Sequence, residues 1–341
     1  MPNYKHGGNI TAFAKEIGAD VSEVIDLSSN INFLKPHINI DFNSLDIAPY
    51  PNYDNLEHAI AHLYQVKQEV LELFNGATTA IYTLFRELNL THATLYSPCY
   101  LEYKKAAHAH NYSIEFINRF EHIEQEVKEH SFVIFVNPST PDGKFYDIEK
   151  LMKKWIEKKC TILIDESFLD FTPFESAIKY LKIYDKLYIL KSMTKFYSSA
   201  GIRVGALLSN EKNIKAIRAK EPLWKISEFD SQYLQSALKD KSFVEKAKTV
   251  NKENRTLLNE VLKNSNLIEK VYPSTANYIL IKLKTIKAEE LQKRLIPYKI
   301  MIRDCFNFDG LDNAYVRIAV KDKHSIQTLE KTLKKALKNE S

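Results

Sequence analysis

Lys195 and Arg203 lie on either side of a stretch rich in serine, alanine and glycine near the middle of the chain. The lysine follows an apolar run of strand type that ends at Ser192. A lysine at the end of a buried strand can lose part of its hydration, and desolvation lowers an amine pKa enough for Schiff-base chemistry. The forked charge of Arg203 suits a phosphate, and small flexible residues let N–H and hydroxyl groups point at an anion. The stretch therefore predicts a reactive amine beside a phosphate-binding cup.

A carboxylate, Asp165, closes another apolar run about thirty residues earlier in the chain. A continuous apolar run is typical of a buried parallel strand. Ligands of open α/β sheets bind at the carboxyl ends of such strands. The strand–helix–strand spacing would bring Asp165 and Lys195 to the same edge of one sheet.

This combination of side chains resembles the site of the fold-type I enzymes that use pyridoxal 5'-phosphate (PLP). The resemblance implies that Lys195 forms the Schiff base with the cofactor and that Asp165 pairs with its ring nitrogen. It also implies that Ser192 and Arg203 hold the cofactor phosphate. An aspartate at this nitrogen keeps it protonated, so that the ring can accept electrons as a carbanion forms.

The same resemblance implies an α/β fold, the aspartate-aminotransferase-like architecture of fold-type I PLP-dependent transferases. It implies a large PLP-binding domain with a mainly parallel sheet, residues 45–230. A small α+β domain, residues 1–44 and 231–341, would include an N-terminal segment that lines the substrate. A chain of 341 residues is long enough for one large and one smaller domain.

The composition is that of an ordinary globular protein, with 45% hydrophobic and 27% charged residues. The net charge of +5 comes from lysines interspersed with glutamates, so we expect no nucleic-acid partner. No apolar signal sequence or bilayer-spanning stretch is visible, so we expect no membrane partner. Cys99, Cys160 and Cys305 are scattered, and neither they nor the ten histidines show metal-ligand spacing. We therefore expect no metal site and a reducing, cytoplasmic location.

A Gly-Gly pair near the N-terminus, Gly7 and Gly8, follows His6 in a chain with only eight glycines. Such a backbone can lie close to a ligand, and the N-terminus of the helix behind it favours an anion. A short strand further on ends in small polar residues that can present Asn30 to a ligand. These segments resemble, more narrowly, the threonine-phosphate decarboxylases of cobalamin synthesis, which are sisters of the histidinol-phosphate aminotransferases. The resemblance implies that His6, Gly7, Gly8 and Asn30 border the substrate and its phosphate.

Three further segments match places where this family contacts its cofactor. A glycine turn opens a helix at Ala77 and Thr78, and the resemblance assigns their N–H groups to the PLP phosphate. Tyr100, at the end of a strand, matches the aromatic residue that stacks on the PLP ring. Tyr50 and Tyr53 match a segment in which a tyrosine reaches across a dimer interface to the neighbouring subunit's PLP phosphate. We therefore expect a homodimer.

The loop after the apolar run 132–136 departs from the family pattern. The family has Asn-Pro-Thr-Gly, whose asparagine bonds the ring hydroxyl oxygen of the cofactor, whereas Thr140 stands at that position here and Asp142 at the threonine position. A hydroxyl donates one hydrogen bond where an amide offers two donors and an acceptor. Either Thr140 contacts the ring oxygen alone, or Asn137 turns toward it. Phe168 also replaces a tyrosine found in many transaminases, so we expect a ring oxygen with few donors around it.

Two arginines lie within apolar strand patterns near the C-terminus, Arg303 after Ile302 and Arg317 between Val316 and Ile318. A strand arginine that faces a cleft suits a carboxylate or a phosphate through paired hydrogen bonds. The resemblance implies that Arg317 binds the α-carboxylate of an amino-acid substrate and that Arg303 contacts its phosphate. It also places Asn277 in the wall of the site.

The residues and the resemblance together predict a PLP-dependent decarboxylase of a small O-phosphorylated amino acid. The substrate would be L-threonine O-3-phosphate or L-serine O-phosphate (phosphoserine), and the product an amino-alcohol phosphate. The alternative is an aminotransferase of the histidinol-phosphate type. An alternative from another class is a catalytically weak PLP-fold binding subunit, which the Thr140 departure motivates.

Overall fold

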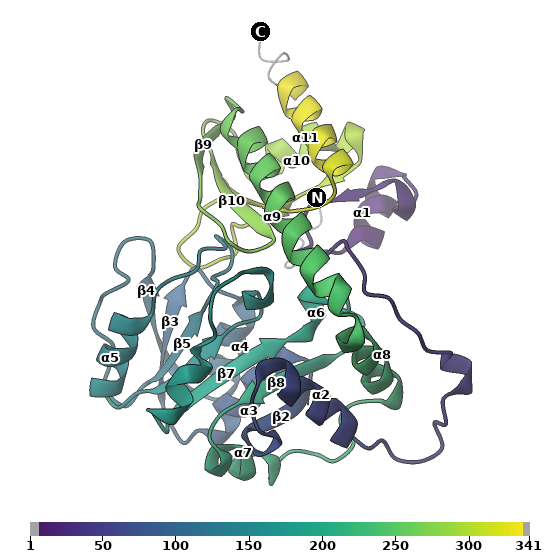
Figure 1. Ribbon diagram of the computed structural model, residues 1–341. Coiled ribbons are helices and arrows are strands. Elements are labelled where there is room, and N and C mark those ends of the chain that lie inside the picture. The colour runs from purple at the N-terminus through teal and green to yellow at the C-terminus, as the bar shows by residue number, and fades with distance from the viewer. Residues whose placement is uncertain (1–6, 337–341) are drawn as a thin grey trace.

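The computed structural model describes residues 7–336, and its centre is a seven-stranded sheet (Figure 1). The strands are β2 (Leu71–Asn75), β3 (His92–Ser97), β4 (Ser113–Asn118), β5 (Phe132–Val136), β6 (Thr161–Asp165), β7 (Leu187–Ser192) and β8 (Val204–Leu208). Their spatial order is β2-β8-β7-β6-β5-β3-β4. β8 runs antiparallel to both neighbours and the other pairs are parallel, so the expected mainly parallel sheet is confirmed.

The central strands β5, β6 and β7 are buried along their whole length because both faces of the sheet are covered. Alternate residues point to opposite faces: Phe135 and Ile164 join one hydrophobic core, whereas Ile134 and Leu163 join the other. The covering helices are α2 (Asp54–Tyr64), α3 (Ala77–Glu87), α4 (Leu101–Ala109), α5 (Glu149–Glu157), α7 (Glu211–Arg218) and α8 (Glu228–Lys239). A one-turn helix, α6 (Met193–Phe196), follows directly after β7.

A smaller unit packs above the carboxyl ends of this sheet (Figure 1). Its four-stranded antiparallel sheet has the order β12 (Arg303–Asp304), β13 (Tyr315–Ala319), β10 (Tyr278–Leu283) and β9 (Ile268–Val271). A parallel pair joins β1 (Ile25–Asp26) to β11 (Ile300–Met301). The helices are α1 (Ile10–Ile17), α9 (Lys241–Lys263), α10 (Ala288–Leu295) and α11 (Lys323–Ala336). Short 3-10 helices occupy Val21–Glu23, Phe42–Ser44, Gln68–Val70, Leu169–Phe171, Ala177–Lys182 and Ile296–Tyr298.

The long helix α9 connects the two units, and Figure 1 shows it running from one to the other. Near its start Phe243 and Ala247 belong to a core of the large sheet, whereas Leu258 and Leu262 near its end belong to the core of the small unit. The packing therefore changes within α9. The residue ranges given above for the two domains stay a prediction.

No helix within residues 7–336 is long and apolar enough to cross a membrane. In the same residues no group of three or more histidine, cysteine, aspartate or glutamate side chains is arranged to hold a metal ion. Cys99, Cys160 and Cys305 are all buried with free thiols.

Candidate active site

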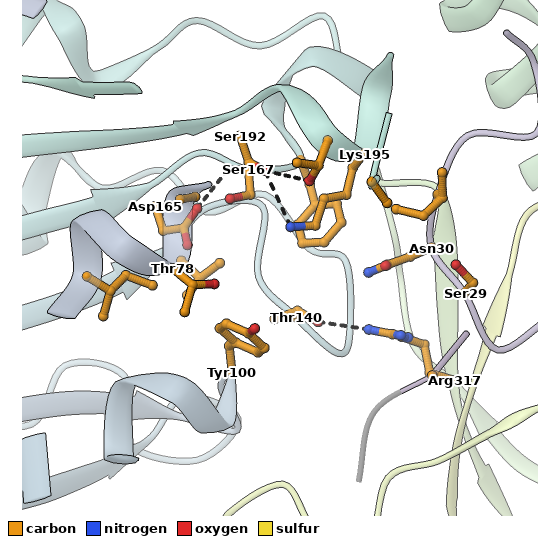
Figure 2. A pocket seen from close by; sticks show the side chains of 18 of the residues that line it. Ser29, Asn30, Thr78, Tyr100, Thr140, Asp165, Ser167, Ser192, Lys195 and Arg317 are labelled. Atoms are coloured by element: carbon orange, nitrogen blue, oxygen red, sulfur yellow. Dashed lines mark hydrogen bonds between the residues drawn. The ribbon is translucent and has the colours of Figure 1, made fainter. Parts of the chain in front are cut away.

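A cavity of about 360 Å³ lies where the carboxyl ends of β5, β6 and β7 meet the small unit (Figure 2). It gathers residues that the sequence predicted separately and that lie far apart in the chain. The predicted site residues that line it are Gly7, Asn30, Ala77, Thr78, Tyr100, Thr140, Asp165, Ser192, Lys195, Arg203, Arg303 and Arg317.

Lys195 lies in α6 at the cavity wall, directly beyond the end of β7. Its Nζ is 3.4 Å from Ser192 Oγ, to which it donates, and Figure 2 shows it turned into the cavity. Burial lowers the pKa of Lys195; the nearby Asp165 opposes this shift, and Arg203 adds to it. A lowered pKa leaves more of the amine unprotonated near neutral pH, which is what a Schiff-base lysine requires.

Asp165 ends β6 and is buried. Its Oδ1 accepts a hydrogen bond of 2.8 Å from the Ser167 backbone N–H, and its Oδ2 accepts one from the Tyr103 hydroxyl. The sequence reasoning missed Tyr103. It lies three residues after Tyr100, the residue that precedes α4, and the two rings are 5.9 Å apart.

The N-terminus of α3 forms a close-packed cradle with Arg203. Gly76 precedes the helix with a φ of +78°, and a Cβ there would lie 2.5 Å from Arg203 Nη2. A Cβ at Gly205 would lie 2.4 Å from the Ala77 backbone nitrogen, so the strand and the helix N-terminus touch through glycine. Arg203 Nη1 donates to the Ala200 carbonyl at 2.8 Å, which holds the guanidinium beside the helix end.

These residues fit PLP. Helix N–H groups, the Ser192 hydroxyl and Arg203 provide donors and positive charge for a phosphate. Asp165 would be the acid that faces the ring nitrogen, and Lys195 would supply the amine for the aldehyde carbon. Tyr100 lines the cavity as a flat ring that can cover a face of the cofactor, and Figure 2 shows it across the cavity from Lys195.

The loop after β5 contains both Thr140 and Asn137, the two residues considered above as contacts to the ring oxygen of the cofactor. Its side-chain amide donates to the Tyr146 carbonyl at 3.0 Å and accepts from the Tyr146 N–H at 2.9 Å. The Asn137 side chain is thus hydrogen-bonded within its own loop, and the alternative in which it turns toward the cofactor is wrong. Thr140 lines the cavity instead, and its Oγ1 accepts a hydrogen bond of 3.3 Å from Arg317 Nη1.

Of the two other residues that depart from the family pattern, Phe168 lines the cavity and Asp142 does not. Phe168 lines the cavity with its ring centre 5.7 Å from Lys195 Nζ, and a phenyl ring offers no hydroxyl donor. Asp142 is buried outside the cavity wall, where it accepts from the hydroxyls of Ser139 and Tyr146. Burial raises the pKa of Asp142.

Arg303 and Arg317 face each other across the β12–β13 pair, and both are buried in the cavity wall. Arg317 Nη2 donates to the Ser28 carbonyl at 3.1 Å, and its Nε has no hydrogen-bond partner among the described residues. Arg303 Nη2 donates to Asn307 Oδ1 at 2.7 Å. Burial, with Arg317 nearby, lowers the pKa of Arg303 to about 10. Two buried cations placed side by side favour an anionic ligand.

Some predicted residues lie outside the cavity wall. Asn277 is buried, and its Nδ2 donates to the Asn30 carbonyl at 2.7 Å, so it positions a cavity residue and does not line the cavity itself. Gly8 is one residue removed from the wall, and its N–H donates to Ser28 Oγ at 2.9 Å. Its neighbour Gly7 packs against the Ser28 carbonyl, which a Cβ would approach to 2.4 Å. The prediction for His6 lies outside the described residues.

Neither predicted tyrosine of the 50–53 segment reaches the cavity of this chain. Tyr50 is 73% exposed, and its ring stacks on Trp224 at 4.0 Å. The Tyr53 hydroxyl donates to the Ile226 carbonyl at 3.0 Å and accepts from the Ile226 N–H at 2.8 Å. Their predicted contact with a neighbouring subunit stays a prediction.

Hydrogen bonds of the segment 28–32 connect the small unit to the backbone of Lys195. Besides the bonds to Ser28 and Asn30, the Lys321 ammonium group donates to the Ile31 carbonyl at 3.1 Å. At the other end, the Asn32 N–H donates to the Lys195 carbonyl at 3.0 Å. Sequence reasoning did not single out Lys321, because no local pattern distinguishes it from the other lysines near the C-terminus.

Known proteins are similar in sequence to this chain along nearly its whole length. The chain is 28% identical over 357 residues to threonine-phosphate decarboxylase of Salmonella typhimurium, covering 98% of this chain and 97% of the relative. It is 27% identical over 354 residues to histidinol-phosphate aminotransferase of Methanocaldococcus jannaschii, covering 98% and 95%. It is also 28% identical over 340 residues, 93% of this chain, to the adenosylcobalamin biosynthesis bifunctional protein CobDQ of Leptospira interrogans, of which it spans 39%.

Among solved structures, histidinol-phosphate aminotransferase from Clostridium acetobutylicum superposes with a TM-score of 0.82 and 31% identity. The match covers 92% of this chain and 99% of that one. The family model for class I and II aminotransferases matches residues 22–335. The chain therefore belongs to the class I and II aminotransferases, PLP-dependent enzymes with the fold-type I architecture.

Proposed function

We propose that the protein decarboxylates a small O-phosphorylated amino acid, L-threonine O-3-phosphate or L-serine O-phosphate, to an amino-alcohol phosphate. The observation that carries this proposal is the charge of the cavity wall. The cationic side chains that line it are Lys195, Arg203, Arg303 and Arg317. Asp165 is the one carboxylate of the described residues in the same wall.

The roles of these charges leave two arginines for the substrate. Arg203 belongs to the cofactor phosphate and Asp165 to the ring nitrogen. A phosphorylated amino acid has one anion for Arg317, its carboxylate, and a second for Arg303, its phosphate. Histidinol phosphate has a phosphate but no carboxylate, and its imidazole would find no second acid in the described wall. The charge pattern thus favours a doubly anionic substrate.

PLP, when bound, supplies the electron sink that stabilises the carbanion left at Cα. Arg317 would hold the substrate carboxylate and Arg303 the substrate phosphate, and together they would fix which bond at Cα is oriented to break. If the bond to the carboxylate carbon is the one that breaks, CO2 would leave. The Lys195 amine, in its protonated form, would then return a proton to Cα, and the Asp165 carboxylate would stabilise the proton on the ring nitrogen.

Transamination of the histidinol-phosphate type is the second candidate, and the relatives of that name support it as strongly as the decarboxylases do. In that case Arg317 would hold the carboxylate of the amino donor. A catalytically weak binding subunit is supported less, since Lys195, Asp165 and Arg203 all line one cavity.

We also propose that the protein acts as a homodimer, with Tyr50 in the interface. An aromatic ring that is 73% exposed and stacked on Trp224, itself 49% exposed, is typical of a surface that a partner covers. The second copy would place such a tyrosine near the phosphate cradle.

The reaction is tested with purified protein and added PLP, offered phosphothreonine, phosphoserine and histidinol phosphate in separate tubes. Each is assayed with and without 2-oxoglutarate, and CO2 and glutamate are followed in the same tube. We expect CO2 from phosphothreonine or phosphoserine without any need for 2-oxoglutarate. Glutamate formed without CO2 would refute the decarboxylase and establish the aminotransferase.

A further inference from the structure

The Tyr103 hydroxyl is buried directly behind the acid of the site. Tyr103 is 0% exposed, lies in the first turn of α4, and still reaches the cavity wall. Its hydroxyl donates to Asp165 Oδ2, while the Ser167 backbone N–H donates to Oδ1. Each oxygen of Asp165 therefore carries one donor from the protein.

The surroundings of Tyr103 hold its ring in place and keep its hydroxyl group protonated. The ring packs in the core between α3, α4 and the sheet, and it stands perpendicular to the Tyr100 ring at 5.9 Å. Burial raises the pKa of Tyr103 well above its usual value, and the charge of Asp165 acts in the same direction. The phenol thus keeps its proton and acts as the donor to the carboxylate.

A carboxylate has about four lone-pair sites, of which the two protein donors occupy two. The remaining ones can face the cavity. A hydrogen bond donated to a carboxylate stabilises its negative charge. The Ser167 donor is a backbone group, whereas the Tyr103 donor depends on one hydroxyl that can be removed.

We propose that Tyr103 is a positioning residue for the cofactor. It holds Asp165 at the angle that directs its free lone pairs into the cavity. Its hydrogen bond also stabilises the negative charge of the Asp165 carboxylate, which would face the protonated ring nitrogen of bound PLP. The inference goes beyond the proposed reaction, because it concerns the cofactor whichever bond of the substrate breaks.

The test compares Tyr103→Phe with Tyr112→Phe, both loaded with PLP labelled with 15N in the ring. Tyr112 is a matched control: it is also buried, but its hydroxyl donates to the Leu88 carbonyl, away from the cavity. The 15N resonance of the bound cofactor reports whether the ring nitrogen is protonated, and a separate titration gives the dissociation constant of PLP. No substrate is needed, so failure here is distinct from failure of the proposed reaction.

In Tyr103→Phe we expect the 15N resonance to move toward that of unprotonated pyridine. We expect PLP to bind about tenfold more weakly, as the loss of one hydrogen bond to a charged group implies. Tyr112→Phe should leave both unchanged. A wild-type 15N resonance in folded Tyr103→Phe would overturn the proposal, even if PLP affinity fell, because packing alone would explain that loss.

A second variant covers the case in which Tyr103→Phe does not fold. 3-Fluorotyrosine at position 103 keeps the ring volume and makes the hydroxyl a stronger donor. We expect the 15N resonance to keep its protonated position or to move further from that of unprotonated pyridine. A move in the opposite direction would overturn the proposal.

Discussion

Replacing Arg317 with methionine tests the assignment of the substrate carboxylate. The guanidinium has five N–H donors, of which one bonds the Ser28 carbonyl and one bonds Thr140 Oγ1. The remaining donors, including the unpartnered Nε–H, suffice for a carboxylate held by two hydrogen bonds. At about 1.5 kcal/mol for each such bond, the loss is about 3 kcal/mol. This corresponds to a roughly 150-fold decrease in kcat/KM.

The assay is steady-state release of CO2 from phosphothreonine or phosphoserine, with PLP affinity measured separately. We expect kcat/KM to fall while PLP affinity stays at the wild-type value. Arg119→Met is a matched control, because Arg119 is also buried, donates to the Tyr96 and Val136 carbonyls and has an unpartnered Nε among the described residues. Arg119 does not line the cavity, so its loss should lower thermal stability and not kcat/KM. An Arg317→Met enzyme within threefold of wild-type kcat/KM would refute the reasoning.

Three further changes probe the rest of the site. The rate at which apoprotein captures PLP should rise as the pH rises through the lowered pKa of Lys195, because only the neutral amine attacks the aldehyde. The charge of Asp165 raises this pKa, so Asp165→Asn should move the rise in rate to lower pH. An unmoved or upward-shifted pH profile would contradict this coupling. Thr140→Val should raise KM about tenfold, the effect of one hydrogen bond to a charged group; an unchanged KM would show that the Arg317 contact is unimportant. Gly205→Ala would force the N-terminus of α3 away from β8. PLP affinity measured by titration should then fall at least tenfold, because contacts to the phosphate are lost. Wild-type PLP affinity would argue against a phosphate at this cradle.

The sheet and its catalytic edge were predictable because their signals are local. The apolar runs that became β5, β6 and β7 are buried on every residue. A polar residue marks each carboxyl end: Asp165 and Ser192 are the last residues of β6 and β7, and Asn137 follows β5. The spacing of Asp165 and Lys195 placed both at one edge, and both line the cavity. Arg317 was detectable because a charged side chain is unexpected within an apolar strand.

The supporting contacts were not predictable, because they join residues that only the fold brings together. Tyr103 is hydrogen-bonded to Asp165, which lies 62 residues away in the sequence, and Lys321 to Ile31, which lies 290 residues away. Asn277 looked like a cavity residue, but its amide holds the backbone of the 28–32 segment from behind. Helical or strand periodicity predicts which face of an element is buried, but it does not predict which residues, distant in the sequence, that face contacts.

The most direct measurement of the central claim is to trap the cofactor on its lysine. Holoprotein is reduced with borohydride and digested, and the peptide that carries the phosphopyridoxyl group is found by mass spectrometry. We predict the label on Lys195 and its loss in Lys195→Ala. Label on Lys191, which is buried in an ion pair with Glu166, or on any lysine outside the cavity would contradict the account.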